Sequence, residues 1–401
     1  MKLAFIHDGP LFESDGGYYE YSYHNLYERY SYIADEITFL IRTAPVGPNS
    51  GLTPVPHEIK VTAVPNTKSP KALLRNSAEA NQIIQKCVEE NDIFILRLQS
   101  MIAEKALKYI LKAGKPFICE VVACAWDSYW NHSALGKLVA PIEFARVRGA
   151  VRKSDYVYYV TTEFLQSRYP ANSEAHTVCC SNVVLDSLDD TALQRRIKRQ
   201  EGKPIHGRPL IMGTAAALDT RYKGQEYVIR AIPLLRELGI DVEYRLAGGK
   251  NRNPEDNYLA DVAKSCGVAD RVKFVGTLSK DCMRAFYEDL DVYVQPSKQE
   301  GLPRAVIEAM ATGCPCIGTN IAGIPELIQN DLLFEKGSAK EIVSATQKLL
   351  SLNLADVSRR NYQTSTRYAY DILEARRREF YDCFIKDKLG ANSAETGGLE
   401  V

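Results

Sequence analysis

The chain has 401 residues, of which 45% are hydrophobic and 25% charged, so it is too long for a single hydrophobic core and long enough for two. A formal net charge of zero excludes a general electrostatic attraction to nucleic acid, and no apolar stretch reaches the length of a membrane span. The ten cysteines form no C-x-x-C pair and lie mostly in apolar runs, which predicts reduced thiols, no zinc site and a cytoplasmic protein.

The first half of the chain alternates short β-rich runs with longer helical patterns. The opening run "KLAFIH" is followed at once by charge and glycine, so it predicts a strand rather than a signal peptide. Several runs are apolar on both faces, which is typical of buried parallel strands. We expect strands at 2–7, 36–41, 59–64, 92–97, 116–122 and 155–161, helices at 70–90, 100–113 and 133–152, and a Pro- and Gly-rich surface loop at 42–58.

A polar, charged stretch then separates this series from a second one, and we place a linker at 186–207. The second series predicts strands at 208–213, 241–248, 271–276, 291–297 and 314–319, with helices between them. Two such series indicate an α/β fold of two doubly wound, Rossmann-like domains that face a cleft, with ligands at the carboxyl ends of the strands. The predicted units are 1–185, 208–365, a C-terminal helix at 366–388 that packs back on the first domain, and a flexible tail at 389–401.

The segment "SKQEGLPRAVIEAMATGCP" (297–315) joins a buried strand to a helix. Pro303 suits the start of a helix, and Gly301 suits a turn before it. Glu300 therefore precedes the helix and Glu308 lies about one and a half turns inside it. Free backbone N–H groups near Gly301 and Leu302 favour an anion such as a diphosphate, and the two carboxylates suit sugar or ribose hydroxyls. The competing interpretation is that both glutamates are ordinary surface residues.

This segment, as "EGLPRAVIEAMATGCPCIGTNIAGIPELI", resembles the donor-binding signature of family-4 glycosyltransferases, which have the two-domain GT-B fold. The pieces "MGTAAALDTRYKGQEYVIRAIPLL", "YRLAGG", "RVKFVGTLS" and "DLDVYVQPS" agree in order, so the match is strong over 209–335. The resemblance implies a retaining transferase with a nucleotide-diphosphate sugar donor and no bound metal. It makes 208–365 the donor domain and 1–185 the acceptor-side domain.

The resemblance also implies a role for individual residues. Glu300 would hold hydroxyls of the donor sugar, Glu308 the ribose, and Lys223 the diphosphate. As the group on the departing diphosphate, Lys223 would serve catalysis together with Glu300, because the leaving group gains negative charge. The other donor-binding positions are the N–H groups of Gly301 and Leu302 ahead of Pro303, Thr277 and Leu278 at the base, and Gly16 and Gly17 facing the phosphates from the first domain.

The stretch before the lysine departs from the family pattern. An arginine is usual a few residues ahead of it, whereas "GTAAALDTRYKG" has alanine or leucine there. Arg221 is the nearest replacement, at a different spacing, and Arg304 is a second candidate for the missing cation.

The acceptor side is less specified. "ACAWDSYWNH" (123–132) follows a strand and holds both tryptophans, and we name Asp127 as the candidate contact for an acceptor hydroxyl, against the alternative of a packed loop. Tyr23, Tyr27 and Tyr30 share one helical face, which indicates helix packing or an acceptor platform. The basic clusters 145–153 and 193–200 suit either solvated helix faces or weak peripheral contact with anionic lipid.

The sequence therefore predicts a glycosyltransferase that moves a sugar from a UDP- or GDP-sugar to a glycan or lipid-linked acceptor with retention, by resemblance in bacterial surface polysaccharide synthesis. Two alternatives stay open: a soluble sugar-phosphate acceptor, and a non-catalytic nucleotide-sugar-binding subunit. A metal-binding role for "DLD" at 289–291 is rejected, because its aspartates suit a helix end and a strand start. A dehydrogenase is disfavoured because no strand is followed by G-x-G-x-x-G.

Overall fold

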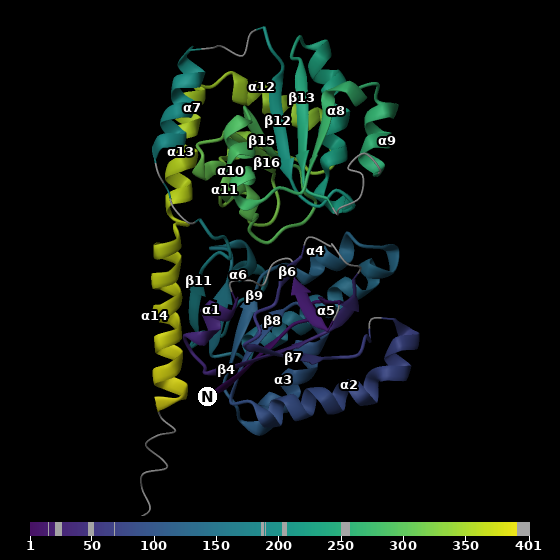
Figure 1. The fold of residues 1–401 in the computed structure, drawn as a ribbon, viewed down its shortest axis with the longest axis vertical. Coiled ribbons are helices and arrows are strands. Elements are labelled where there is room, and N and C mark those ends of the chain that lie inside the picture. The colour runs from purple at the N-terminus through teal and green to yellow at the C-terminus, as the bar shows by residue number, and fades with distance from the viewer. Residues whose placement is uncertain are drawn as a thin grey trace, which may run out of the picture.

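The structure is a computed structural model that describes residues 1–14, 16–20, 26–46, 52–67, 69–185, 188, 190–202, 207–249 and 257–390. Two α/β domains are stacked along the long axis of the molecule, each with a sheet at its centre and helices around it (Figure 1). The fold class expected from the sequence is therefore confirmed. Tyr23 and the expected tail from residue 391 on lie outside the described residues.

The N-terminal domain is built on a seven-stranded sheet in the order β11-β10-β9-β8-β1-β4-β7, and all its neighbouring strands are parallel. Its strands are β1 (Lys2–Ile6), β4 (Glu36–Ile41), β7 (Ile59–Ala63), β8 (Ile93–Leu98), β9 (Phe117–Val121), β10 (Tyr156–Tyr159) and β11 (His176–Cys179). Its helices are α1 (Leu26–Ser31), α2 (Pro70–Glu90), α3 (Met101–Ala113), α4 (Ala125–Trp130), α5 (Ala134–Arg152) and α6 (Phe164–Arg168). β8 is buried along its whole length, as its continuous apolar run predicts for a central parallel strand.

A second, four-stranded sheet in the order β5-β2-β3-β6 differs from the expectation of a plain loop at 42–58. Its strands are β2 (Leu11–Ser14), β3 (Gly17–Glu20), β5 (Thr43–Pro45) and β6 (Thr53–Pro54). The hairpin of β2 and β3 supplies the pairing edges on which β5 and β6 form, so the Pro- and Gly-rich stretch takes part in a sheet that local propensity does not predict.

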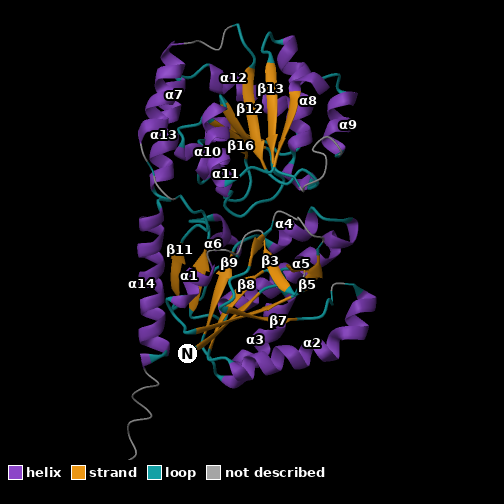
Figure 2. Cartoon of the chain, in the orientation of Figure 1, coloured by secondary structure: helices purple, strands orange, loops and turns teal. Residues whose placement is uncertain are grey.

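The C-terminal domain has a six-stranded parallel sheet in the order β14-β13-β12-β15-β16-β17 (Figure 2). Its strands are β12 (Leu210–Ala215), β13 (Val242–Ala247), β14 (Val272–Gly276), β15 (Val292–Gln295), β16 (Cys316–Thr319) and β17 (Leu333–Phe334). Its helices are α8 (Gln225–Glu237), α9 (Tyr258–Ser265), α10 (Lys280–Asp289), α11 (Arg304–Ala311), α12 (Ala339–Leu350) and α13 (Leu354–Thr366), with short 3₁₀ turns at Arg221–Lys223, Ala269–Arg271 and Asn330–Leu332.

The expected linker at 186–207 contains a helix, α7 (Asp190–Gly202), that packs against α13 of the C-terminal domain. Arg196 of this helix is buried and donates to the backbone carbonyls of Thr312, Leu290, Tyr287 and Glu288. The cluster 193–200 is therefore only partly solvated and only partly accessible to lipid, because its central residue Arg196 caps the backbone carbonyls at the C-terminal ends of α10 and α11. Charge and polarity made the segment resemble a linker, while tertiary contacts make it part of a domain.

The helix α14 (Tyr370–Lys388) leaves the C-terminal domain and runs alongside the N-terminal one, close to the bounds expected for it (Figure 1). Tyr156 of β10 donates its hydroxyl to Asp387, and Lys388 pairs with Asp155 at 2.6 Å. The chain thus crosses between the domains twice. No helix within the described residues is both long and apolar enough to cross a membrane.

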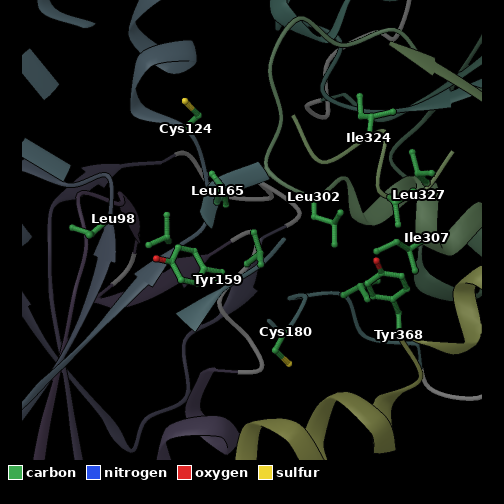
Figure 3. Packing of buried hydrophobic residues seen from close by; sticks show 14 of the residues in the cluster. Leu98, Cys124, Tyr159, Leu165, Cys180, Leu302, Ile307, Ile324, Leu327 and Tyr368 are labelled. Atoms are coloured by element: carbon green, nitrogen blue, oxygen red, sulfur yellow. The ribbon is translucent and has the colours of Figure 1, made fainter. Parts of the chain in front are cut away.

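The hydrophobic core is continuous between the domains. Figure 3 shows Leu302 of the C-terminal domain between Leu165 and Tyr159 on one side and Ile307 and Leu327 on the other. Polar contacts join the domains at the same level: the carboxylate of Glu326 accepts hydrogen bonds from the backbone N–H groups of 162–164 at the start of α6 and from the Thr162 hydroxyl. These contacts hold the carboxyl ends of the two sheets against each other.

Candidate functional site

A cavity of about 470 Å³ lies between the domains, where the carboxyl ends of their strands meet. From the C-terminal domain it is lined by Lys280, Glu300, Gly301, Leu302, Arg304 and Glu308, and from the other side by Leu26, Arg29, Arg97, Val122, Val160, Asn182 and Val184. Two other cavities, on the far end of the C-terminal sheet and beside α7, are lined by residues to which the motifs do not point.

The sequence segment around Lys223 folds so that the lysine meets the loop before α11. Gly224 has φ +72°, and a Cβ there would lie 2.0 Å from the carbonyl oxygen of Pro296, so only glycine fits. Lys298 N–H donates to the Tyr222 carbonyl at 2.7 Å, which ties the two loops together. As a result Lys223 Nζ lies 2.6 Å from Glu300 Oε1.

Glu300 is held by three donors on one oxygen. Besides Lys223, the Gln295 amide and the Ser297 hydroxyl donate to Oε1, at 3.0 and 2.7 Å. Its second oxygen, Oε2, accepts no hydrogen bond from the described residues. The carboxylate is thus fixed in direction and keeps one acceptor atom for a ligand on the cavity side.

The ammonium of Lys223 remains charged at neutral pH. Burial lowers the pKa of this group, but the adjacent Glu300 carboxylate more than offsets burial and raises the pKa above its ordinary value. A group that develops negative charge beside Glu300 would meet a cation that is already in place.

Glu308 is half-buried on the face of α11 that lines the cavity. The hydroxyl of Tyr287 in α10 donates to its Oε2 at 2.8 Å. Burial, and then the Glu308 carboxylate, raise the pKa of Tyr287 well above its ordinary value, so this phenol stays a donor. Glu308 is therefore a positioned acceptor and not a solvated surface glutamate.

Gly301 serves a different purpose from the turn that its sequence context suggested. Its φ is not in the left-handed region, but a Cβ at this position would lie 2.2 Å from the carbonyl oxygen of Val122, just after β9. The missing side chain lets the loop ahead of α11 touch the N-terminal domain. Within the described residues the N–H groups of Gly301 and Leu302 donate to no acceptor, so they are available to a ligand at the start of α11.

Not all predicted donor-site residues line this cavity. Lys223 and Pro303 lie beside the lining residues Glu300 and Leu302, whereas Arg221, Thr277 and Leu278 lie elsewhere. The guanidinium of Arg221 stacks over the ring of Tyr258 in α9, at 4.5 Å from its centroid, and so points to another helix. Thr277, which is exposed, donates its hydroxyl to Gly249 O, next to the partly buried Leu278 at the end of β14. Of the two candidates for the missing cation, the structure brings Arg304 to the cavity and not Arg221.

Gly16 and Gly17 belong to the β2–β3 hairpin, where Gly17 pairs with Ser14, and neither lines the cavity. Gly16 has φ +75°, which explains a glycine at this turn without any ligand. Their predicted contact with phosphates remains a prediction.

Asp127 lies on α4, a helix where a packed loop or an acceptor site was expected. Its carboxylate is half-buried, makes no hydrogen bond within the described residues and does not line the cavity. Trp126 packs edge-on against Phe144, whereas Trp130 is exposed. The next residue, Asn131, donates to the Lys298 carbonyl of the other domain, so α4 borders the cleft.

Of the three tyrosines expected on one helical face, Tyr30 contributes to packing. Tyr30 is fully buried, and its hydroxyl donates to Glu120 Oε1 at 2.7 Å. The "DLD" aspartates also have structural partners: Asp291 accepts two hydrogen bonds from Arg208, and Asp289 lies at the end of α10 near Arg245. No cluster of three or more metal-ligating side chains occurs in the part of the chain that the structure describes.

Sequence reasoning missed the side of the cavity formed by the N-terminal domain. Arg29, Arg97 and Asn182 come from α1, β8 and the crossing after β11, and no motif connects them. Glu326 and its contact with α6 were also missed, because a carboxylate that caps a helix in another domain has no local signal.

Comparisons with known proteins bear on the family and the fold. Residues 209–352 match the family model of glycosyl transferases group 1. The chain is similar to Protein CapJ of Staphylococcus aureus, with 26% identity over 352 residues that cover 86% of this chain and 85% of that protein. It is also similar to a GDP-mannose-dependent phosphatidylinositol monomannoside mannosyltransferase of Mycobacterium tuberculosis, with 31% identity over 32% of this chain and 35% of that enzyme.

Among solved structures, Anabaena HepE in complex with UDP is similar over 96% of this chain and 99% of that one, with a TM-score of 0.64 and 17% identity. Sucrose-phosphate synthase from Thermosynechococcus elongatus has a TM-score of 0.66 over the same shares, with 16% identity. These likenesses show the two-domain GT-B fold.

Proposed function

Since residues 209–352 match the family model of glycosyl transferases group 1, we propose that the protein transfers a sugar from a UDP- or GDP-sugar to a glycan or lipid-linked saccharide, with retention of configuration. The observation that carries this proposal is the contact of Lys223 with Glu300 at the start of α11, on the wall of the interdomain cavity. This contact places Lys223, a cation suited to a phosphate, next to Glu300, a hydrogen-bond acceptor suited to sugar hydroxyls.

The chemistry requires stabilisation of the leaving group. When the bond between the sugar and the β-phosphate breaks, negative charge develops on the nucleoside diphosphate. Lys223 and the N–H groups of Gly301 and Leu302 are preorganised donors for that charge, so the protein itself supplies what a metal ion supplies in other sites. Glu300 Oε2 would accept a hydroxyl of the donor sugar, and Glu308 the hydroxyls of the ribose.

The names of similar proteins support the donor class. HepE is described in complex with UDP and with UDP-glucose, and the mycobacterial relative as GDP-mannose-dependent. A role in bacterial surface polysaccharide synthesis is supported by similarity to Protein CapJ and to a glycosyltransferase of colanic acid biosynthesis from Escherichia coli.

A lipid-linked acceptor is supported by the surface of α5. Leu135, Leu138 and Ile142 of this helix are 68%, 74% and 54% exposed and share one helical face. Arg152 and Lys153 follow at its end, so an apolar stripe continues into positive charge. Such a surface suits peripheral contact with an anionic membrane on the cytoplasmic side. Asp127 on the neighbouring α4 stays our candidate for contact with the acceptor hydroxyl.

The first experiment measures thermal stabilisation by UDP, GDP, ADP and their sugars, with and without EDTA. A ligand at one hundred times its dissociation constant adds about 2.7 kcal/mol, which is readily seen. Stabilisation by one nucleotide family that survives EDTA supports the donor class and a metal-independent site. No stabilisation by any of them would contradict the proposal.

Glu300→Ala tests the site itself. We expect loss of transfer, because the carboxylate is needed to hold the donor sugar. The fold should stay intact but with a lower melting temperature, because the buried Lys223 loses its ion-pair partner. The exposed Glu335→Ala is the matched control and should turn over normally. Normal transfer by Glu300→Ala would rule out the site. If wild type binds donor but neither transfers nor hydrolyses it, the non-catalytic subunit is the better interpretation; transfer to a sugar phosphate alone would favour the soluble acceptor.

A further inference from the structure

The side of the cavity formed by the N-terminal domain carries a buried arginine without a counter-ion. Arg29 of α1 is only 7% exposed, yet it lines the cavity. Its Nη1 donates to Asn182 Oδ1 at 2.8 Å, and its guanidinium lies 5.9 Å from the ring centroid of Tyr158. Its Nε is buried without a partner, and no carboxylate among the described residues pairs with it.

Arg29 forms no ion pair with a neighbouring carboxylate among the described residues, although the charge of Glu120 acts on it from a distance. The buried carboxylate nearest in the network, Glu120, receives Arg97 Nε at 3.0 Å and the Tyr30 hydroxyl at 2.7 Å, so both of its oxygens are engaged elsewhere. Behind Arg29, a third buried arginine, Arg377, pairs with Glu374. A buried charge without a partner is unfavourable, and proteins retain one mainly where a ligand supplies the opposite charge.

The described residues that line the cavity have a surplus of positive charge. Four of them are cationic, Arg29, Arg97, Lys280 and Arg304, against the two carboxylates Glu300 and Glu308, which is a formal charge of +2. The ligand that fits this wall is an anion. Arg29 comes from the domain opposite α11, so an anion held by both would bridge the cleft.

We propose that Arg29 binds a phosphate or carboxylate oxygen of the substrate from the side of the N-terminal domain, in addition to the cations Lys223 and Arg304 of the other domain. This inference rests on the proposed function. Two sources share the chemistry: the diphosphate of the donor and an acidic group on the acceptor. Asn182 positions Arg29 from the crossing between the domains.

The test compares wild type with Arg29→Gln and Arg29→Lys. The probes are the nucleoside diphosphate that binds wild type, the corresponding nucleoside, and inorganic pyrophosphate, measured by calorimetry and thermal shift. Arg378→Gln is the matched control, because it removes the same charge from exposed α14 nearby without lining this cavity.

If Arg29 binds the donor, Arg29→Gln lowers the affinity for the nucleoside diphosphate and for pyrophosphate at least tenfold and leaves the affinity for the nucleoside unchanged. Arg29→Lys then restores part of the lost affinity. If it binds an acidic acceptor, donor affinity is unchanged and the acceptor KM rises at least tenfold. In both cases the free Arg29→Gln protein keeps or raises its Tm, since an uncompensated charge is removed. Unchanged affinity and unchanged acceptor KM, with or without a lower Tm, would overturn the proposal.

The outcome separates this proposal from the function it rests on. Wild type that binds no nucleotide contradicts the proposed function, and the effect of Arg29→Gln on pyrophosphate stabilisation still decides the anion site. Wild type that transfers sugar while Arg29→Gln behaves identically contradicts only the role of Arg29. Wild type stabilised by neither nucleotides nor pyrophosphate contradicts both.

Discussion

The two walls of the interdomain cavity are made in different ways. The wall in the C-terminal domain comes mostly from one continuous stretch, 300–308, with Lys223 brought against it by a second loop. The opposite wall is assembled from α1, β8 and the crossing at Asn182, which are far apart in the chain. The first wall comes mostly from one sequence motif, whereas the second is formed by segments that only folding brings together.

The walls also differ in how their charges are balanced. Lys223 has Glu300 at 2.6 Å, and Glu308 has the Tyr287 hydroxyl at 2.8 Å, so the donor-side groups are partnered before any ligand arrives. Arg29 has an amide oxygen but no carboxylate. The Lys223–Glu300 pair is preorganised for chemistry, while Arg29 is arranged to gain most when an anion binds.

The largest expected effect that distinguishes the walls is that of Lys223→Met. Loss of one preorganised donor to the leaving group should lower kcat about 10²–10³-fold, and should leave Glu300 without its main partner. Lys298→Met, two positions before Glu300 with its amine facing Glu226 and the Tyr227 ring, is the control and should keep its activity. Steady-state kinetics of sugar transfer measure both; a wild-type kcat in Lys223→Met would mean that another group stabilises the leaving group.

A smaller effect is expected when the two walls are forced apart at their closest approach. Gly301→Ala places a Cβ against the Val122 carbonyl, so the loop ahead of α11 must shift away from β9. We expect donor KM to rise and kcat to fall, together about tenfold in kcat/KM, since misplacement of a positioned group is costly. Gly149→Ala, in α5 with open space around it, is the matched control. Wild-type kinetics in Gly301→Ala would show that the contact between the domains does not position the motif.

The smallest effect is expected at Glu104, a carboxyl group of the N-terminal domain that does not line the cavity. It tests whether a buried ionisable group in this domain can lack a ligand. Burial, and then Glu143, raise the pKa of Glu104 in α3 to about 8. Its folded state therefore binds the proton more tightly than the unfolded state, and this contribution to stability is complete below about pH 4.5 and is lost as pH rises to 8. Glu104→Gln should gain on the order of 1–2 kcal/mol relative to wild type at pH 8.5 and little at pH 5. Melting temperatures at both pH values measure it, and an equal shift at both would contradict the titration of Glu104.

The sequence predicted local features, such as the strands and the motif at 300–308, better than features that distant segments form together. The eleven expected strands form within about two residues of their predicted bounds, because buried parallel strands are continuous apolar runs. The segment 186–207 was expected to be a linker, but it contains the helix α7. Polarity does not distinguish a linker from such a helix, because α7 buries one arginine, Arg196, whose guanidinium donates to backbone carbonyls at the ends of other helices. Arg221 was the nearest replacement in sequence, although at a different spacing. Its guanidinium stacks on Tyr258, and Arg304 lines the cavity instead.

By itself, the sequence determined the two α/β domains and the placement of Glu300, Gly301 and Glu308 around one helix start, because strand and helix periodicity and a turn between them are local properties. Only the tertiary structure decided that Lys223 meets Glu300, that Gly301 is needed to touch Val122, and that Arg29 faces the same cavity. The physical reason is that charge balance and close approach depend on neighbours in space, and those neighbours are supplied by distant segments of the chain.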